Sequence, residues 1–339
     1  MSKEHYVVIG NGPAGHHAAF TLREKAGEDA RVTLINGHEG GSYRPHLLPE
    51  FISGDISEEA LYVSPLSDYG EKGIKLRAAQ QVVALDPKER FVIFDHKEIL
   101  SYTGAVIAVG GRPRIPEPLL AFEELMTTLK TLEDAMVWIR RLAVVDSVLM
   151  IGGDLTSLAL TRALLKLNKH VVFMLNEDAF WPLRCDEALF DAVGERLTAE
   201  GVEVIDHGRI KGMTRRSEDL YDVTIGDRRL EVGMIGAFFG LRPDIRFLSK
   251  SGLRMERGVL VDEYLATGFE GLYAAGDCAQ VYHPGIRDYW VSIGHDNAAA
   301  LGRIAALNLL GCRVPAKVSA TSIFDVQGVK ANTSWWTEF

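Results

Sequence analysis

The stretch "YVVIGNGPAG", residues 6–15, decides the fold. An apolar run is followed by Gly10, Gly12 and Gly15 in the spacing G-x-G-x-x-G, and then by a helix-compatible segment and a second apolar run at residues 31–36. The first glycine permits a tight turn, the second lets the backbone approach a pyrophosphate, and the third lets helix and strand pack closely. The pattern predicts a strand–turn–helix whose N-terminal N–H groups hold a dinucleotide diphosphate.

The ribose end of this unit departs from the usual pattern. An acidic residue about 20 positions after the fingerprint normally bonds a ribose hydroxyl. Asn36 stands near that place, and Glu39 follows it closely. An Asn amide bonds a hydroxyl without charge assistance, so the sequence leaves Asn36 and Glu39 as alternative ribose ligands.

A second unit of the same kind lies at residues 148–174, "VLMIGGDLTSLALTRALLKLNKHVVFM". Gly152 and Gly153 hold the turn, but Asp154 stands where the backbone would approach a pyrophosphate, and Ser157 replaces the packing glycine. An Asp at a helix start can cap the free N–H groups itself and would repel a diphosphate. The sequence therefore predicts a second nucleotide-type unit and leaves its use of a nucleotide open.

The second strand of this unit ends in Asn176 and Glu177. No Lys or Arg follows at residues 176–178 to pair with a 2′-phosphate, which favours NADH over NADPH. If a nicotinamide nucleotide binds, the sequence predicts contacts with Gly152, Gly153, Asp154, Asn176 and Glu177.

Composition narrows the class of protein. The chain has 339 residues, 47% of them hydrophobic, which is enough for a sizeable core and two domains. Its net charge of −9 argues against nucleic acid or an anionic membrane as a main partner. The sequence shows no apolar run of about 18 residues and no signal-peptide pattern, so we expect no membrane span and a cytoplasmic location.

The three cysteines, Cys185, Cys278 and Cys312, are far apart in the sequence and form no C-x-x-C pair. A structural zinc or iron–sulfur site needs about four clustered ligands. The sequence therefore predicts no metal site and no redox disulfide between neighbouring cysteines.

Three further stretches point to a family. They are "TGAVIAVGGRPRIP" at residues 103–116, "GAFFGLRPDIRFLSKSGLRMERGVLVDEYLAT" at residues 236–267, and "GLYAAGDCAQV" at residues 271–281. With them the chain resembles the FAD-dependent pyridine nucleotide-disulfide oxidoreductases, and most of all the NADH:rubredoxin and ferredoxin reductases, which lack the redox disulfide. The resemblance covers nearly all of residues 5–312. It implies an α/β fold of two Rossmann-like, three-layer ββα domains, with the second inserted in the first.

The resemblance also assigns residues to the flavin. Gly276 and Asp277 match the pair that contacts the ribityl chain and phosphate, and Val82 matches a backbone contact to the adenine. The helix that begins near His295 matches one that faces the pyrimidine edge of the ring, and we interpret His295 itself as a polar residue at this helix start rather than a proton donor. In full, the FAD contacts implied are Gly10, Gly12, Pro13, Ala14, Gly15, Asn36, Arg44, Val82, Ala108, Gly110, Gly276, Asp277 and His295.

The segment "SYRPHLLPEFISGD", residues 42–55, matches the stretch beside the flavin ring. Arg44 and Pro45 are the candidate residues of the ring environment, because an Arg there would stabilise the negative charge of reduced flavin. Relatives often carry a Lys a few positions later. This chain has Glu50 and no Lys in the segment, so no ion pair is carried over.

The expected domains follow from the resemblance. A split FAD domain takes residues 1–112 and 250–339, and an inserted NAD(H)-type domain takes residues 113–249. The segment after Gly311 has room for one strand or hairpin, so the family's C-terminal dimerisation domain is expected to be short or absent. Trp335 and Trp336 near its end either pack on the body or contact a partner.

The sequence favours one function and leaves a second open as the alternative. The first is an NADH-dependent flavoprotein that moves electrons between NAD(H), FAD and a one-electron protein such as a ferredoxin, a rubredoxin or an iron–sulfur subunit, as part of a larger redox complex. The second is an FAD electron-transfer or docking module that does not use NAD, because its second nucleotide motif is degraded. A non-redox, structural FAD-binding protein is the least favoured reading.

Overall fold

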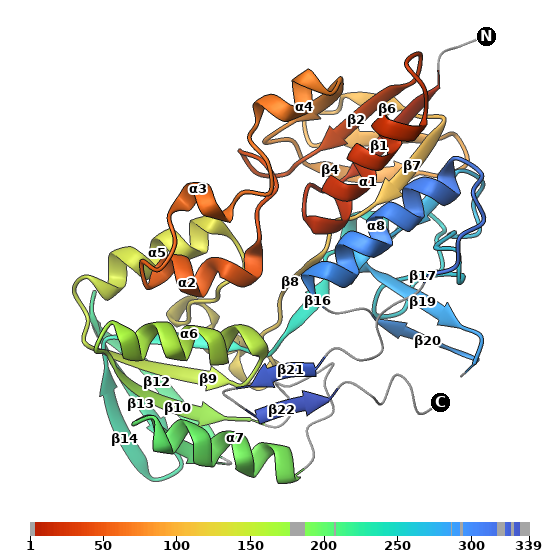
Figure 1. Cartoon of the computed structure of the whole chain (residues 1–339). Coiled ribbons are helices and arrows are strands. Elements are labelled where there is room, and N and C mark those ends of the chain that lie inside the picture. Colours follow the sequence, from red (N-terminus) through yellow and green to blue (C-terminus); the bar gives the residue numbers. More distant parts are fainter. Residues whose placement is uncertain are drawn as a thin grey trace.

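The computed structural model describes residues 4–176, 187–206, 208–285, 287–291 and 294–316, together with two strands at 323–326 and 329–332. Figure 1 shows two α/β lobes, an upper one around the sheet β18-β7-β1-β2-β3 and a lower one built from the middle of the chain, with the C-terminal strands β21 and β22 beside the lower lobe. The predicted architecture, two Rossmann-like units with one inserted in the other, is confirmed. Cys185, Trp335 and Trp336 lie outside the described residues.

A five-stranded parallel sheet forms the centre of the upper lobe, in the order β18-β7-β1-β2-β3. Both β1 and β7 are buried along their whole length, as is usual for parallel strands covered on both faces, and this explains their apolar sequences. β18 follows the inserted lobe in the sequence, so a distant part of the chain completes this sheet. The strands are β1 (His5–Ile9), β2 (Arg31–Ile35), β3 (Ile74–Arg77), β7 (Gly104–Ile107) and β18 (Leu272–Ala274).

Two helices from opposite ends of the sequence, α1 (Pro13–Lys25) and α8 (His295–Leu309), lie side by side against this sheet (Figure 1). Their closest approach is at Gly302, where a Cβ atom would lie 2.0 Å from the backbone oxygen of Ala14. Only glycine permits two helix backbones to come so near. The N-terminal turns of both helices thereby reach one common cavity.

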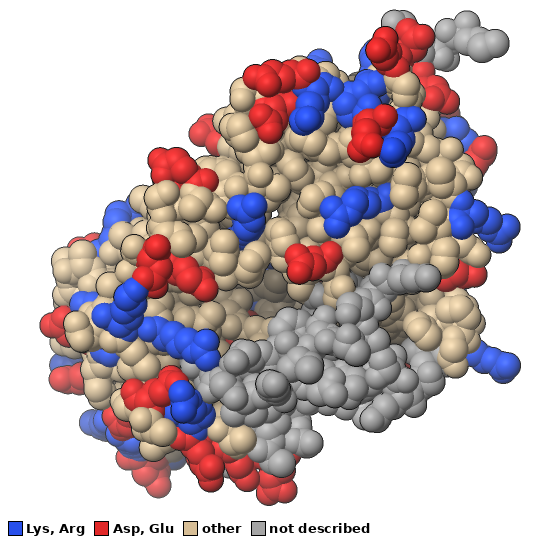
Figure 2. All heavy atoms as spheres, viewed as in Figure 1, with Lys and Arg blue, Asp and Glu red and all other residues tan. Residues whose placement is uncertain are grey.

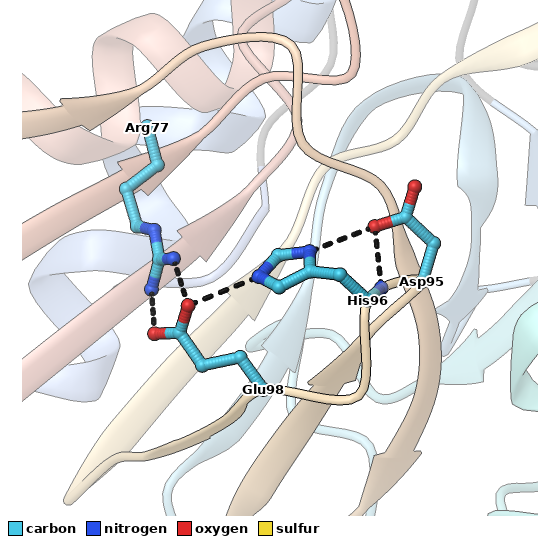
Figure 3. Close-up of polar contacts among 4 residues, drawn as sticks. All are labelled: Arg77, Asp95, His96 and Glu98. Atoms are coloured by element: carbon cyan, nitrogen blue, oxygen red, sulfur yellow. Dashed lines mark hydrogen bonds and ion pairs between the residues drawn. The ribbon is translucent and has the colours of Figure 1, made fainter.

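A small antiparallel sheet joins the upper lobe, with strands β4 (Val82–Asp86), β5 (Phe91–Phe94) and β6 (Ile99–Ser101). Figure 3 shows how Arg77, at the end of β3, holds the β5–β6 turn through two hydrogen bonds of 2.7 and 2.6 Å to Glu98. Glu98 also lies 3.1 Å from the His96 ring, which contacts Asp95. The carboxylates are largely exposed, so this network orients the turn more than it stabilises the fold.

The lower lobe repeats the same plan. A four-stranded parallel sheet, in the order β11-β10-β9-β15, carries the helices α6 and α7, and an antiparallel sheet β12-β13-β14 lies beside it (Figure 1). The parallel strands are β9 (Ser147–Gly152), β10 (His170–Leu175), β11 (Glu203–Asp206) and β15 (Met234–Phe238). The other elements are α6 (Leu155–Lys166), α7 (Glu187–Ala199), β12 (Ile210–Ser217), β13 (Leu220–Ile225) and β14 (Arg228–Val232).

The chain crosses between the lobes at two short strands, β8 (Gly111–Pro113) and β16 (Leu241–Pro243), which pair antiparallel with each other. A second connection comes from the excursion between β2 and β3, which forms η1 (Pro45–Leu47), α2 (Leu48–Ile52), α3 (Glu58–Leu61) and α4 (Ser67–Glu71). Residues of α2 and α3 share a hydrophobic core with the lower lobe, including the fully buried Trp138 of α5 (Leu132–Leu142). Part of the first segment therefore packs as a cap on the inserted lobe.

Shorter elements complete the described chain. They are η2 (Glu117–Leu125), η4 (Arg246–Leu248), η5 (Gly276–Cys278), β17 (Val259–Val261), β19 (Ala279–His283), β20 (Asp288–Val291), β21 (Ile323–Val326) and β22 (Val329–Asn332). The strands β21 and β22 pair as an antiparallel hairpin that lies beside α7 (Figure 1). Among the described helices, none has the length and apolar character needed to cross a membrane.

Candidate functional site

A cavity of about 1120 Å³ lies between the two lobes and is lined by both. Pockets for drug-sized ligands span roughly 300–1,000 Å³, so this cavity has room for a dinucleotide. Most of the residues expected from the sequence line it, namely Gly10, Gly12, Pro13, Ala14, Asn36, Pro45, Val82, Ala108, Gly110, Asp154, Gly276, Asp277 and His295. Five of the expected residues do not line it, namely Gly15, Arg44, Gly152, Gly153 and Asn176, and Glu177 lies outside the described residues.

The glycine fingerprint makes one end of the cavity an anion site. Gly10 has φ +103°, and a Cβ there would lie 2.3 Å from the oxygen of Ala108, while one on Gly15 would lie 1.7 Å from the oxygen of Gly10. A Cβ on Gly12 would meet nothing within 4 Å, so this position borders open space. Gly12 precedes α1 and supplies no side-chain cap, which leaves the first N–H groups of the helix to a ligand. These features fit the diphosphate of FAD.

The expected ribose end is arranged differently from the simplest prediction. The Asn36 side chain folds back on its own loop, donating to the oxygen of Gly40 at 3.1 Å and accepting from the N–H of His38 at 3.3 Å. Glu39 lines the cavity with an exposed side chain. Of the two alternatives left open by the sequence, Glu39 has a carboxylate with no hydrogen bond to the residues that the structure describes, and Asn36 shapes the loop that carries it.

Gly276 and Asp277 of the "GDC" turn line the cavity. Gly276 has φ +73°, and a Cβ there would lie 2.9 Å from the Cβ of Ala14, so η5 packs tightly against α1 and carries Asp277 into the cavity wall. The neighbouring Cys278 is fully buried, and burial raises the pKa of its thiol to about 11. A buried, protonated thiol is unreactive.

The part of the cavity assigned to the flavin ring contains a feature that the sequence reasoning missed. The Arg44 guanidinium turns to the backbone, donating to the oxygens of Tyr62 at 2.8 Å and Ala60 at 3.3 Å. Its neighbour His46 lines the cavity instead, with its ring centroid 4.8 Å from that of His295. His46 directly follows the Arg44-Pro45 pair in the sequence, which could have marked it as a candidate. Only the fold brings it beside His295.

The nicotinamide-type end shows what Asp154 does. Its carboxylate accepts from the N–H of Ser157 at 2.9 Å, which caps α6, and from the N–H of Gly240 at 3.0 Å, which ties α6 to the loop after β15. Burial raises the pKa of this carboxyl. The Asp therefore takes up backbone donors that a diphosphate would otherwise use.

The turn before α6 is otherwise of the dinucleotide type. Gly152 has φ +128°, and a Cβ there would lie 1.8 Å from the oxygen of Phe238, so only glycine fits. The N–H of Asn176 donates to the oxygen of Gly152 at 2.8 Å, which positions the end of β10 beside the turn. Within the described part of the chain, no three His, Cys, Asp or Glu side chains gather into a metal site.

Residues of two dinucleotide-type turns line one cavity, an arrangement that fits a protein of two nucleotide-binding units. A model of the family described as pyridine nucleotide-disulphide oxidoreductase matches residues 4–295. Putidaredoxin reductase CamA of Pseudomonas putida is 30% identical over 328 residues, which are 93% of this chain and 76% of that protein. Rubredoxin-NAD(+) reductase of Ectopseudomonas oleovorans is 24% identical over 331 residues, covering 95% of this chain and 84% of the relative.

The structural comparison agrees with the sequence comparison. The structure of an NAD-dependent persulfide reductase from A. fulgidus superimposes with a TM-score of 0.85 and 26% identity, covering 95% of this chain and 62% of that one. This chain belongs to the pyridine nucleotide-disulphide oxidoreductase family. It is an oxidoreductase of a family that binds FAD and uses NAD(H), and the family resemblance seen in its motifs is confirmed.

Proposed function

We propose that this protein is an FAD-dependent oxidoreductase that moves electrons between NADH and a one-electron protein partner. The observation that carries the proposal is the single cavity in which the uncapped start of α1 faces the start of α6. A flavin held at the first turn and a nicotinamide nucleotide at the second would bring their reactive rings together. Hydride exchange between them is the cofactors' own chemistry, and the protein supplies position and electrostatics.

The roles of the residues follow from their places in the wall. The first turn of α1 would bind the FAD diphosphate, Glu39 the ribose, and Asp277 the ribityl hydroxyls. Arg44, held by Ala60 and Tyr62, would act on the ring region through its charge rather than by contact. The division into an FAD domain at 1–112 plus 250–339 and an inserted domain at 113–249 is part of the proposal. It is supported by the crossing at β8 and β16.

The partner is proposed to be a ferredoxin, a rubredoxin or an iron–sulfur subunit of a larger redox complex. Putidaredoxin reductase and rubredoxin-NAD(+) reductase bear the names of such partners, and this supports the choice. On the face shown in Figure 2, Lys and Arg alternate with Asp and Glu, so the charges visible there do not select an acidic or a basic partner. We propose a cytoplasmic location on the composition of the chain.

The alternative, an FAD module that does not use NAD, is favoured by one observation. Asp154 occupies the N–H groups of Ser157 and Gly240 and places a carboxylate at the start of α6. A diphosphate would have to displace it or bind beside its charge. The two functions therefore differ in whether NADH reduces the bound flavin.

An anaerobic titration separates them. Flavin-loaded protein is mixed with millimolar NADH, and the loss of flavin absorbance is followed, with dithionite as the positive control and NADPH as the specificity control. We expect NADH to bleach the flavin and NADPH to do so less effectively. Bleaching by dithionite but never by NADH would replace the proposed function with the alternative.

A further inference from the structure

Two histidines from distant parts of the sequence meet in the cavity wall. His46 belongs to η1 in the excursion after β2, and His295 is the first residue of α8. Their ring centroids are 4.8 Å apart, with ring planes tilted by 58°, and both side chains line the cavity. They lie in the region that the segment around Pro45 and the start of α8 assign to the flavin ring.

The surroundings keep both rings uncharged. Burial is the main cause that lowers the pKa of His46 and of His295 below the ordinary value, and the Arg44 charge acts in the same direction on both. Asp296 raises the pKa of both rings and Glu50 that of His46, but burial outweighs them. The pair is therefore neutral at pH 7.

The neighbouring helix adds no fixed charge at this point. His16 and His17 of α1 also face His295, and burial lowers the pKa of each to about 4. His16 is bonded to the Tyr69 hydroxyl at 3.1 Å, and His17 lies 3.0 Å from the guanidinium of Arg303. Both are neutral at pH 7 and are engaged elsewhere.

One nitrogen of the pair lacks a partner. Nδ1 of His295 is buried and makes no hydrogen bond within the described part of the chain. Buried polar atoms in folded proteins are nearly always paired, so this nitrogen calls for a group that the described residues do not supply. A neutral imidazole with a free nitrogen is a proton acceptor.

We propose that His46 and His295 together hold the proton that accompanies reduction of the flavin in this cavity. The inference rests on the proposed function, because it assumes that FAD fills the cavity. Hydride transfer converts NADH to NAD⁺ and leaves the flavin with one added negative charge. One proton from water then binds one imidazole of the pair, so FAD, NADH, H⁺ and a neutral histidine give anionic reduced FAD, NAD⁺ and a protonated histidine.

The geometry limits the uptake to one proton. A negative charge on the flavin stabilises a protonated imidazole beside it, which raises the pKa of the pair on reduction. A second proton would place two positive rings 4.8 Å apart, which their mutual repulsion opposes. The two histidines therefore titrate as a unit, and reduction by two electrons takes up one additional proton.

The test is the pH dependence of the flavin midpoint potential, measured at equilibrium with dithionite and redox dyes, without NADH. Each proton taken up per two electrons shifts the potential by about 30 mV for a tenfold change in proton concentration. Near neutral pH we expect a slope of about 59 mV per pH unit in the natural protein and about 30 mV in a variant that combines His46→Gln and His295→Gln. The matched control, His38→Gln, changes a histidine of the same cavity outside the pair and should keep the natural slope.

A second measurement follows the pair in the natural protein and uses single variants only to assign the signals. In histidine-labelled protein, the imidazole NMR signals are titrated with pH in the oxidised and the fully reduced states. Single substitutions assign the signals, and the pH midpoint of the pair should rise on reduction. Equal slopes in the natural protein and the double variant, or midpoints unmoved by reduction, would overturn the proposal. Because dithionite supplies the electrons, failure of NADH to reduce the flavin is a separate result that leaves this test intact.

Discussion

Asp154 is the residue whose replacement tests the second nucleotide site most directly. Its carboxylate accepts from the N–H groups of Ser157 and Gly240 at 2.9 and 3.0 Å. We expect Asp154→Gly to free both donors and remove a negative charge, and so to tighten NADH binding. Asp154→Asn removes the charge but keeps an oxygen that can still cap α6, so it separates the two effects.

The repulsion between the Asp154 carboxylate and a diphosphate bound beside it sets the expected change in NADH affinity. Like unit charges about 6 Å apart repel by about 2.8 kcal/mol at an effective dielectric of 20, and partial screening lowers this value. Because 1.4 kcal/mol is a factor of ten, the NADH dissociation constant should fall by about ten- to hundred-fold in Asp154→Gly. Losing the cap and the bond to Gly240 should lower the free energy of unfolding by about 1–3 kcal/mol.

The charge effect also has a pH signature. Burial raises the pKa of Asp154 above 3.8, so its carboxyl is protonated more readily in the folded protein. The free energy of unfolding contains a contribution from this raised pKa. That contribution is fully present below the unfolded pKa of 3.8 and is lost as the pH rises through the folded pKa. NADH affinity of the natural protein should rise as the pH falls through this range, and Asp154→Asn should not show this dependence.

The assay is an anaerobic binding titration of flavin-loaded protein with NADH, together with chemical denaturation of the same samples. Ser157→Ala is the matched control, because it alters the same turn without changing the charge. It should leave NADH affinity near that of the natural protein. Unchanged or weaker NADH binding in both Asp154 variants would refute the argument that the carboxylate obstructs the site.

Further predictions concern the flavin end of the cavity. Gly12→Ala should leave the stability of the flavin-free protein within about 0.5 kcal/mol, because nothing lies within 4 Å of the added atom, yet flavin content after purification should fall. Gly15→Ala places a Cβ 1.7 Å from a backbone oxygen and should cost at least about 1–3 kcal/mol in denaturation experiments. Glu39→Ala should weaken FAD binding about five- to thirtyfold through the lost charged hydrogen bond, measured by flavin fluorescence, and more than Asn36→Ala if the carboxylate is the ribose ligand. Cys278, with its pKa raised to about 11, should resist alkylation in the folded protein at pH 8 and react only after denaturation, as mass spectrometry would show.

Much of the fold was predictable because its signals are local. The spacing of Gly10 and Gly15 places a turn, a strand and a helix at one point, and the structure shows that a Cβ at either position would collide with backbone. The cap that Asp154 places on α6 is also predictable from position alone, since an Asp directly before a helix has N–H groups in reach. The sequence could not say that the second oxygen of this carboxylate binds Gly240, which arrives from a distant strand.

The site was less predictable where a side chain chooses among several partners. Asn36 has the residue type and the position of a ribose ligand, but its amide bonds to Gly40 and His38 in its own loop. Arg44 has the residue type expected beside a flavin ring, but its guanidinium satisfies the carbonyl groups of Ala60 and Tyr62. Such competition depends on distances that a linear pattern does not contain.

The sequence by itself determined the class of protein, because the two strand–turn–helix units are encoded within short stretches in which Gly10, Gly15 and Gly152 leave no room for a side chain. The tertiary structure alone decided which residues share the cavity. It pairs β18 with β7, although the whole inserted lobe lies between them in the sequence. It also packs α2 and α3 on the core around Trp138 and brings the ring of His46 to 4.8 Å from that of His295. The physical reason is that burial of the apolar faces of α2 and α8 fixes the positions of the two histidine rings. Neither histidine belongs to a sequence motif that would predict its contact with the other.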